Sequence, residues 1–306
     1  MNNKAIGVFD SGLGGLTAVK ELLKVLPYEN IIYFGDTGRV PYGDKSRQAI
    51  LKYALQDIEF LKSLDVKMIL AACGTVSSII EESDVNLEIP FTGVIAPTAA
   101  AAASATRNNK IGIIGTAATI KSGSYKRELL KINPNLQIFE QDCPLFVPLV
   151  ENGFIEKDNK ATLIIAEKYL SELRENKIDT LILGCTHYPI ISEIISEVIG
   201  PEVKLIDSGR EAALFAANAL SFSESLTESK SAGTCSFYVS DEVNGFSKTA
   251  ALFLQQDISP KVKMVDIEKY SAIAEKDKQD SALIELDGEN LSQASLSVSL
   301  DMTKSG

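Results

Sequence analysis

Short apolar runs alternate along this chain with longer stretches in which apolar residues recur at helical spacing. The short runs predict buried strands at 4–11, 30–36, 68–72, 90–95, 111–116, 181–184 and 203–207. The longer stretches predict helices at 16–26, 46–64, 76–82, 98–106, 208–220 and 245–253. Because strands that alternate with helices usually pair in parallel, the pattern predicts an α/β fold.

The pattern also repeats within the chain. IGIIGT at 111–116 mirrors IGVFDS at 6–11, an offset of 105 residues (111 minus 6). Further on, the segment 142–153 occupies the position in the second repeat that 36–43 has in the first. Cys185 matches Cys73 at an offset of 112 (185 minus 73). Three landmarks in the same order predict two similar α/β domains with mostly parallel sheets and an active site in the cleft between them.

The repeat also predicts how the chain is divided. We expect a first domain formed by 1–97 plus 207–265, and a second formed by 98–206. The segment 221–233 is rich in Ser, Glu and Thr and predicts a mobile loop, whereas 235–240 predicts an edge strand. A C-terminal extension remains at 266–306, and its polar composition predicts disorder or loose packing on the surface.

Composition narrows the class of protein. The chain has 306 residues, of which 45% are hydrophobic and 23% charged, as expected of a globular protein with room for two domains. A net charge of −11 without a dense Lys/Arg cluster argues against nucleic acid as a partner. No apolar run reaches the ~18 residues of a membrane span, and residues 1–10 do not resemble a signal peptide. We therefore expect a cytoplasmic protein with reduced thiols.

Metal and nucleotide sites are weakly supported. The four cysteines have no Cys-x-x-Cys spacing and one histidine to join them, which argues against zinc. Gly12 and Gly14 follow a predicted strand, as in a dinucleotide-binding turn, but Gly15 comes directly after them, and the next strand has no acidic residue at its end until Asp36. We interpret this as a tight turn that places Asp10 at the carboxyl end of a strand, with Asp36 organising the next loop.

Two cysteines stand at the ends of apolar runs, each followed by small or hydroxyl-bearing residues. Cys73 lies in ACGT at 72–75, and Cys185 in GCTHYP at 184–189. A thiol is a base only as the thiolate, which a helix N-terminus or a neighbouring proton carrier favours. His187 is the candidate partner of Cys185, and Asp10 that of Cys73. The other two cysteines, at 143 and 235, lack such neighbours and are interpreted as structural.

Four hypotheses follow from these residues. Cys185 with His187 fits a hydrolase or lyase that uses a thiol nucleophile. Two thiols facing one another fit an enzyme that removes a proton from one face of a carbon and returns one to the opposite face, inverting a stereocentre without a cofactor. A non-catalytic amino-acid-binding protein on the same plan is a third hypothesis, and inert core cysteines are the fourth.

Five motifs together carry a family resemblance. They are DSGLGGLT (10–17), PYG (41–43), ACGT (72–75), PLVE (148–151) and GCTHYP (184–189). In combination they resemble glutamate racemases, of the cofactor-independent aspartate/glutamate racemase superfamily, over about residues 4–255. The resemblance implies a homodimeric isomerase that interconverts L- and D-glutamate without cofactor or metal, supplying D-glutamate for peptidoglycan. An aspartate racemase, or another acidic amino-acid racemase of the superfamily, is the alternative.

The resemblance also implies roles for individual residues. Cys185 is expected to deprotonate L-glutamate and Cys73 D-glutamate, assisted by Asp10 and His187, with Glu151 near the second thiol. The implied substrate contacts are Asp10, Ser11, Pro41, Tyr42, Gly43, Gly74, Thr75, Thr116, Thr119, Thr186 and His187. One position departs from the family, which usually has Asn where this chain has Gly74. A glycine offers a ligand only its backbone N–H there, which affects affinity and side-chain specificity rather than proton transfer.

Overall fold

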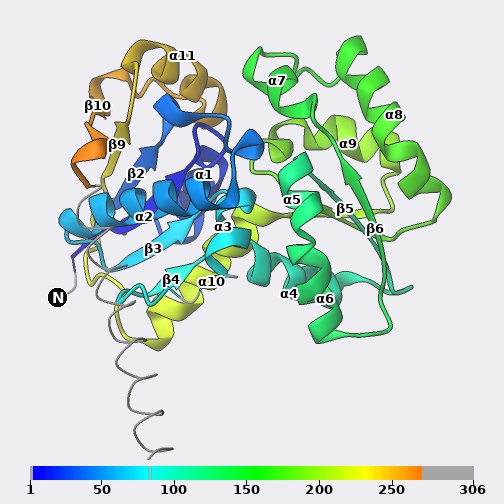
Figure 1. Ribbon diagram of the computed structural model, residues 1–306, viewed down its shortest axis with the longest axis horizontal. Helices are drawn as coiled ribbons and strands as arrows, with labels where there is room; N and C mark the ends of the chain where they lie inside the picture. Colours follow the sequence, from blue (N-terminus) through cyan, green and yellow to red (C-terminus); the bar gives the residue numbers. More distant parts are fainter. Residues whose placement is uncertain (1–2, 82, 84, 271–306) are drawn as a thin grey trace, which may run out of the picture.

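Two parallel sheets form the framework of the protein (Figure 1), whose computed structural model describes residues 3–81, 83 and 85–270. The six-stranded sheet has the order β10 (Val262–Met264), β9 (Cys235–Val239), β2 (Ile31–Gly35), β1 (Ile6–Asp10), β3 (Met68–Ala71) and β4 (Phe91–Thr92). The four-stranded sheet has the order β6 (Gln137–Asp142), β5 (Lys110–Gly115), β7 (Thr180–Leu183) and β8 (Lys204–Asp207). All strand pairings in these described residues are parallel, which confirms the predicted α/β fold.

The two sheets share one strand order. β2-β1-β3-β4 in the first corresponds to β6-β5-β7-β8 in the second, with β1 and β5 at equivalent central positions. Cys73 follows β3 and Cys185 follows β7, so the two thiols occupy equivalent strand ends. The repeat in the sequence therefore reflects a repeat in the topology.

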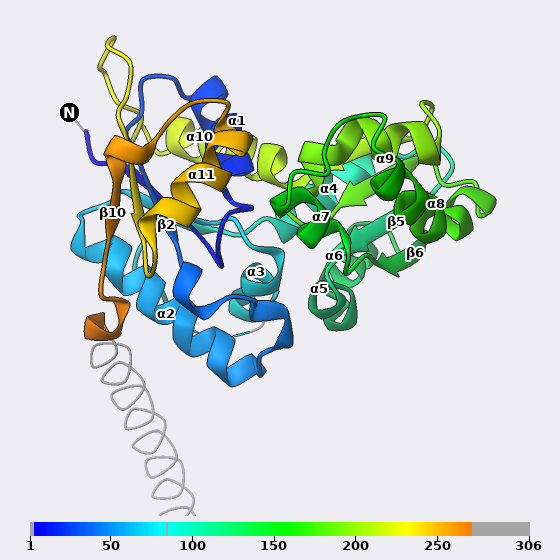
Figure 2. The same ribbon diagram turned by 90° about the horizontal axis from the view of Figure 1, so that it is seen from above.

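Helices cover both sheets (Figure 2). The helices of the first half are α1 (Leu16–Val25), α2 (Arg47–Ser63), α3 (Gly74–Glu81), α10 (Ser208–Phe222) and α11 (Val243–Leu254). Those of the second half are α4 (Ile95–Ala105), α5 (Ala117–Ser122), α6 (Ser124–Ile132), α7 (Phe146–Glu151), α8 (Lys160–Glu175) and α9 (Ser192–Ile199). Short 3-10 helices are η1 (Thr37–Arg39), η2 (Tyr42–Asp44), η3 (Tyr188–Ile191), η4 (Ser259–Lys261) and η5 (Ile267–Tyr270).

Alternating side chains of β1 pack on opposite faces of the first sheet, as the two-residue period of a strand requires. Val8 joins the cluster that contains α1, α10 and α11, whereas Phe9 joins the cluster that contains α2 and α3. The first of these clusters continues through α4 and α10 into the second sheet, where it includes Ile113 and Ile182. One uninterrupted apolar core therefore extends across both halves.

The structure corrects two sequence predictions. The strand predicted at 90–95 is only the two-residue β4, and α4 begins at Ile95 rather than at residue 98. Pro97 fits in the first turn of α4 because backbone N–H groups there have no partner within the helix. The segment 235–240 is not an edge strand, since β9 pairs with β2 on one side and with β10 on the other.

The predicted loop at 221–233 begins inside α10, which ends at Phe222, and its irregular remainder is anchored by several polar contacts. Lys67 and Glu29 form an ion pair with an N–O distance of 2.6 Å, and both side chains are buried. Lys67 Nζ also donates to the carbonyl of Ser225, and the backbone N–H of Thr227 donates to Glu29. The loop is thereby attached to the amino ends of the first sheet's strands.

The first residues of the predicted C-terminal extension pack on the first half. Ile267 is buried, and the ring of Tyr270 meets that of Phe60 edge-on with the centroids 5.5 Å apart. Residues 271–306 lie outside the described part of the chain. Among the described helices, none combines the length and apolarity needed to cross a membrane.

Candidate active site

The turn after β1 places Asp10 at the interface between the halves. Asp10 is buried, and its Oδ2 accepts a hydrogen bond of 2.9 Å from the backbone N–H of Gly12. A Cβ atom on Gly14 would lie 2.5 Å from both His187 Nδ1 and Thr186 Oγ1, so only glycine allows this approach. The glycine-rich turn therefore serves close packing against the other half.

Cys73 ends β3 and directly precedes α3. Its side chain is 8% exposed, and its thiol donates to Ser11 Oγ over 3.6 Å. Burial, together with the nearby carboxylate of Asp10, raises the pKa of Cys73 to about 12. Burial also raises the pKa of Asp10, against the opposing effects of His187 and of backbone N–H groups. Cys73 is therefore a protonated thiol at neutral pH, suited to donating a proton.

Cys185 has a different partner. Its sulfur lies 3.7 Å from His187 Nδ1, and His187 Nε2 lies 2.9 Å from Glu151 Oε1. The ring of Phe253 meets the imidazole edge-on, with the centroids 5.6 Å apart. Burial alone would lower the pKa of His187, but the hydrogen bonds with Cys185 and Glu151 raise it to about 10. The second thiol therefore faces an imidazolium at neutral pH.

This imidazolium makes stability depend on pH. The pKa of about 10 in the folded protein exceeds the ordinary histidine pKa of 6.5, so His187 stabilises the fold fully below pH 6.5 and loses this contribution as pH rises through 10. We expect the free energy of unfolding to fall more steeply between pH 7 and pH 9 in the wild type than in His187→Asn. Urea unfolding at each pH measures this, and parallel curves for the two proteins would contradict it.

Hydroxyl groups from both halves meet beside the thiols. Thr75 Oγ1 lies 3.5 Å from both Thr116 Oγ1 and Thr119 Oγ1, which are 3.0 Å from one another. Thr17 Oγ1 donates to the carbonyl of Thr186 over 2.8 Å. The contacts among Thr75, Thr116 and Thr119 bring the amino ends of α3 and α5 together. N–H and hydroxyl donors of the two halves therefore lie close to one another.

The backbone around the two cysteines is in direct contact. A Cβ atom on Gly74 would lie 2.8 Å from the carbonyl oxygen of Gly184, which is the residue before Cys185. The two cysteines are thus each one residue from a contact between the halves. Their partners Ser11, Asp10 and His187 converge on the same interface.

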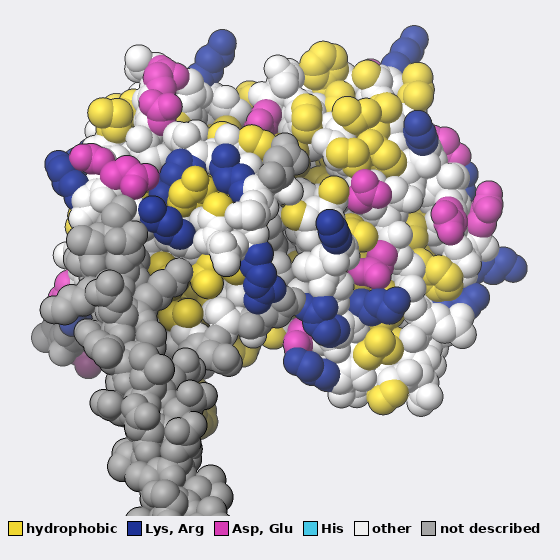
Figure 3. Space-filling view, viewed as in Figure 1, with side chains coloured by type: hydrophobic (Ala, Val, Ile, Leu, Met, Phe, Trp, Pro, Cys, Tyr) yellow, Lys and Arg dark blue, Asp and Glu magenta, His cyan; other side chains and the backbone are white. Residues whose placement is uncertain are grey.

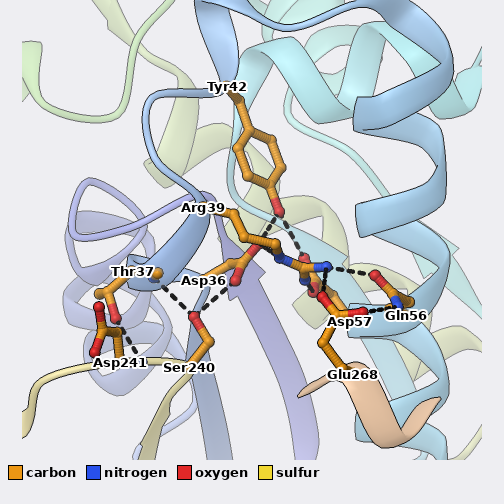
Figure 4. A network of polar contacts seen from close by, with 10 residues as sticks. Asp36, Thr37, Arg39, Tyr42, Gln56, Asp57, Ser240, Asp241 and Glu268 are labelled. Carbon is orange, nitrogen blue, oxygen red and sulfur yellow. Dashed lines mark hydrogen bonds and ion pairs between the residues drawn. The ribbon is translucent and has the colours of Figure 1, made fainter. Parts of the chain in front are cut away.

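The PYG turn is placed differently from the other predicted contacts. Val40 and Pro41 are joined by a cis peptide bond, and a Cβ atom on Gly43 would lie 4.0 Å from Ala118 Cβ of α5. The Tyr42 side chain is buried, and its hydroxyl contacts Asp36 and Asp57 (Figure 4). The hydroxyl of Tyr42 is therefore already paired within the first half.

Several residues around the site were not predicted. Phe253 contacts His187, while Arg39 and Asp57 surround the hydroxyl of Tyr42. A signal for Asp57 exists in the sequence, because it interrupts the buried face of α2 formed by residues such as Ala54 and Ile58. Within the described residues, no three His, Cys, Asp or Glu side chains come close enough together to hold a metal ion.

The fold and the site define an α/β enzyme with paired thiols at equivalent strand ends of two similar halves. Comparison with known proteins makes the class specific. A model of the Asp/Glu/hydantoin racemase family matches residues 34–216. The chain belongs to this family, and it is an isomerase.

Close relatives cover nearly the whole chain. A glutamate racemase of Geobacter metallireducens is 45% identical over 275 residues, which span 90% of this chain and 99% of the relative. A glutamate racemase of Thermoanaerobacter pseudethanolicus is 41% identical over 270 residues, 88% of this chain and all of the relative. The chain is also similar to the crystal structure of Francisella tularensis glutamate racemase in complex with D-glutamate, with 39% sequence identity and a TM-score of 0.79. The match covers 88% of this chain and 100% of that one.

Proposed function

We propose that this enzyme is a glutamate racemase that uses Cys73 and Cys185 as its two acid/base groups and needs no cofactor. The observation that carries the proposal is the pair of thiols at equivalent strand ends, with Asp10 near Cys73 and His187 beside Cys185. Relatives at 41–45% identity with glutamate as their substrate support the choice of amino acid.

In the direction from L-glutamate, Cys185 as the thiolate takes the Cα proton while Cys73 donates its proton to the opposite face. Cys185 thereby becomes the thiol and Cys73 the thiolate, which is the state needed to deprotonate D-glutamate. The carbanion-like transition state carries negative charge onto the α-carboxylate. Thr75, Thr186 and the N–H groups at the start of α3 are the donors proposed to stabilise this charge.

The experiment is racemisation in D2O without added cofactor. We expect both enantiomers of glutamate to be converted and to gain one deuterium at Cα, because the thiols exchange their protons with solvent between turnovers. Polarimetry follows the inversion, and mass spectrometry follows the deuterium. Absence of both signals would refute the proposal, and binding of glutamate by calorimetry in that case would favour an amino-acid-binding protein.

The same assay separates the other hypotheses. A higher kcat/KM with aspartate than with glutamate would identify an aspartate racemase. A covalent acyl-enzyme on Cys185, with Cys73→Ala still active, would instead identify a thiol hydrolase or lyase.

We infer from the resemblance that the product feeds peptidoglycan synthesis and that the enzyme is a homodimer. Hydrophobic side chains gather over α7 and the beginning of α8 (Figure 3), where Leu145, Phe154 and Ile164 are exposed. Such a patch is a candidate contact surface. Sedimentation equilibrium tests the dimer, and growth of a depleted strain with added D-glutamate tests the role in the cell.

A further inference from the structure

We propose that Arg39 is a positioning residue for the substrate, because it fixes the turn formed by Pro41, Tyr42 and Gly43 against α5. The inference rests on the proposed function and on the family resemblance, which implies that this turn contacts glutamate. The turn follows η1, and its far end reaches Ala118 in the other half. Its position across the interface therefore matters for binding.

Arg39 reaches from η1, just before the turn, into a buried polar network (Figure 4). Its Nε donates to Asp36 over 2.6 Å, and its Nη2 donates to Asp57 over 3.0 Å. The guanidinium also donates to Gln56 and lies 4.1 Å from the centroid of the Tyr53 ring. The Arg39 side chain is 11% exposed, so these contacts form away from water, where charge-assisted hydrogen bonds are strong.

The turn is held from its other side by the end of β9. Ser240 Oγ donates to Asp36 over 2.7 Å and accepts a hydrogen bond of 2.9 Å from the backbone N–H of Gly38. The N–H of Asp241 donates to Thr37 Oγ1 over 3.2 Å. The hydroxyl of Tyr42 completes the arrangement by donating to Asp36. Asp36 is thus the shared acceptor, and Arg39 is the cation that balances it.

The network depends on Arg39 because its positive charge balances buried carboxylates. Asp36 and Asp57 are both fully buried, and Arg39 is the guanidinium between them. Without it, two carboxylates would share one site without a counter-ion, which is strongly unfavourable in a buried environment. Glu268 of η5 lies 3.6 Å from Arg39 at the outer edge, so the C-terminal turn covers the network. Loss of Arg39 is expected to release Tyr42 and with it the turn.

The test replaces Arg39 with methionine, which keeps the length of the side chain and removes the guanidinium. We expect KM for L-glutamate to rise roughly 10- to 100-fold, with a smaller change in kcat, because the turn binds ground state and transition state alike. A merely structural role would lower the fraction of active enzyme and with it the apparent kcat, and would leave KM unchanged. Arg174→Met is the matched control, because Arg174 forms an exposed pair with Glu167 on α8.

A second variant covers the case in which Arg39→Met fails to fold. Ser240→Ala removes the hydroxyl that joins Asp36 to Gly38 and leaves the buried charges in place. We expect a rise in KM of roughly fivefold, in line with the loss of one or two hydrogen bonds. Unchanged KM in a folded Arg39→Met protein, or in Ser240→Ala when the first variant is insoluble, overturns the inference.

Hydrogen exchange separates this inference from the proposed function. If the wild type does not racemise glutamate, the proposed function fails, and the amide exchange of 37–43 then decides the role of Arg39. Faster exchange in Arg39→Met, or in Ser240→Ala, than in the wild type supports the inference. Equal exchange rates overturn it.

Discussion

Replacing Cys185 with serine is expected to lower kcat for glutamate racemisation by roughly 10²–10⁴-fold, the range that general acid–base catalysis contributes. A hydroxyl keeps the shape of the side chain but is a far weaker acid than a thiol, so it does not become a base beside His187. Cys73→Ser is expected to have an effect of similar size, because each direction of the reaction uses both groups. Circular dichroism of the two enantiomers measures the rates.

Cys235→Ser is the matched control for both substitutions. Cys235 lies in β9, in the sheet but outside the proposed site, so the same change of sulfur to oxygen is expected to leave kcat and KM near the wild-type values. Full activity in either Cys73→Ser or Cys185→Ser would contradict the two-thiol mechanism. Loss of activity confined to Cys185→Ser would instead favour a single nucleophile.

Restoring the usual asparagine at position 74 is expected to lower kcat/KM by roughly 100-fold rather than to improve the enzyme. Any side chain at this position adds a Cβ atom, which would lie 2.8 Å from the carbonyl oxygen of Gly184. The backbone of the other half must then move away, which carries Cys185 with it. Because proton transfer depends steeply on distance, the loss is expected mainly in kcat. Steady-state kinetics of Gly74→Asn and Gly74→Ala test this.

A control variant separates the displacement of Cys185 from a general loss of protein stability. Gly7→Ala adds the same methyl group in β1, where it would lie 3.2 Å from Leu61 Cδ1 and 3.3 Å from both methyl carbons of Val66. These are ends of flexible side chains away from the thiols, so we expect lower stability and nearly unchanged kcat. Activity of Gly74→Asn at or above the wild-type level would show that the two halves separate without cost.

Much of the fold was predictable because local patterns determine it. Apolar runs such as 68–72 mark buried parallel strands, and the repeat of IGVFDS marks equivalent central strands. The same runs located the candidate cysteines, since the residue after a buried strand lies at the carboxyl end of its sheet. Edge positions were harder to predict, because β10 is three residues long and carries no periodic signal.

The polar network behind the PYG turn was not predictable from local patterns. Its members come from 36–42, from α2, from the end of β9 and from η5, so more than 200 residues (268 minus 36) separate the first from the last. Asp36 alone was expected to organise its loop. Asp57 interrupts the apolar face of α2, but the sequence does not say which residues it pairs with, and Arg39 in its polar loop carries no such signal. Only the tertiary structure brings the partners together.

The apolar core that passes without interruption from α1 through α10 and α4 to the second sheet has a consequence for folding. Cutting the chain at the repeat boundary would expose a broad hydrophobic surface on each fragment, and neither fragment could bury it alone. Although the two halves repeat one topology, we do not expect either to fold by itself. The enzyme is expected to melt cooperatively, as one thermodynamic entity.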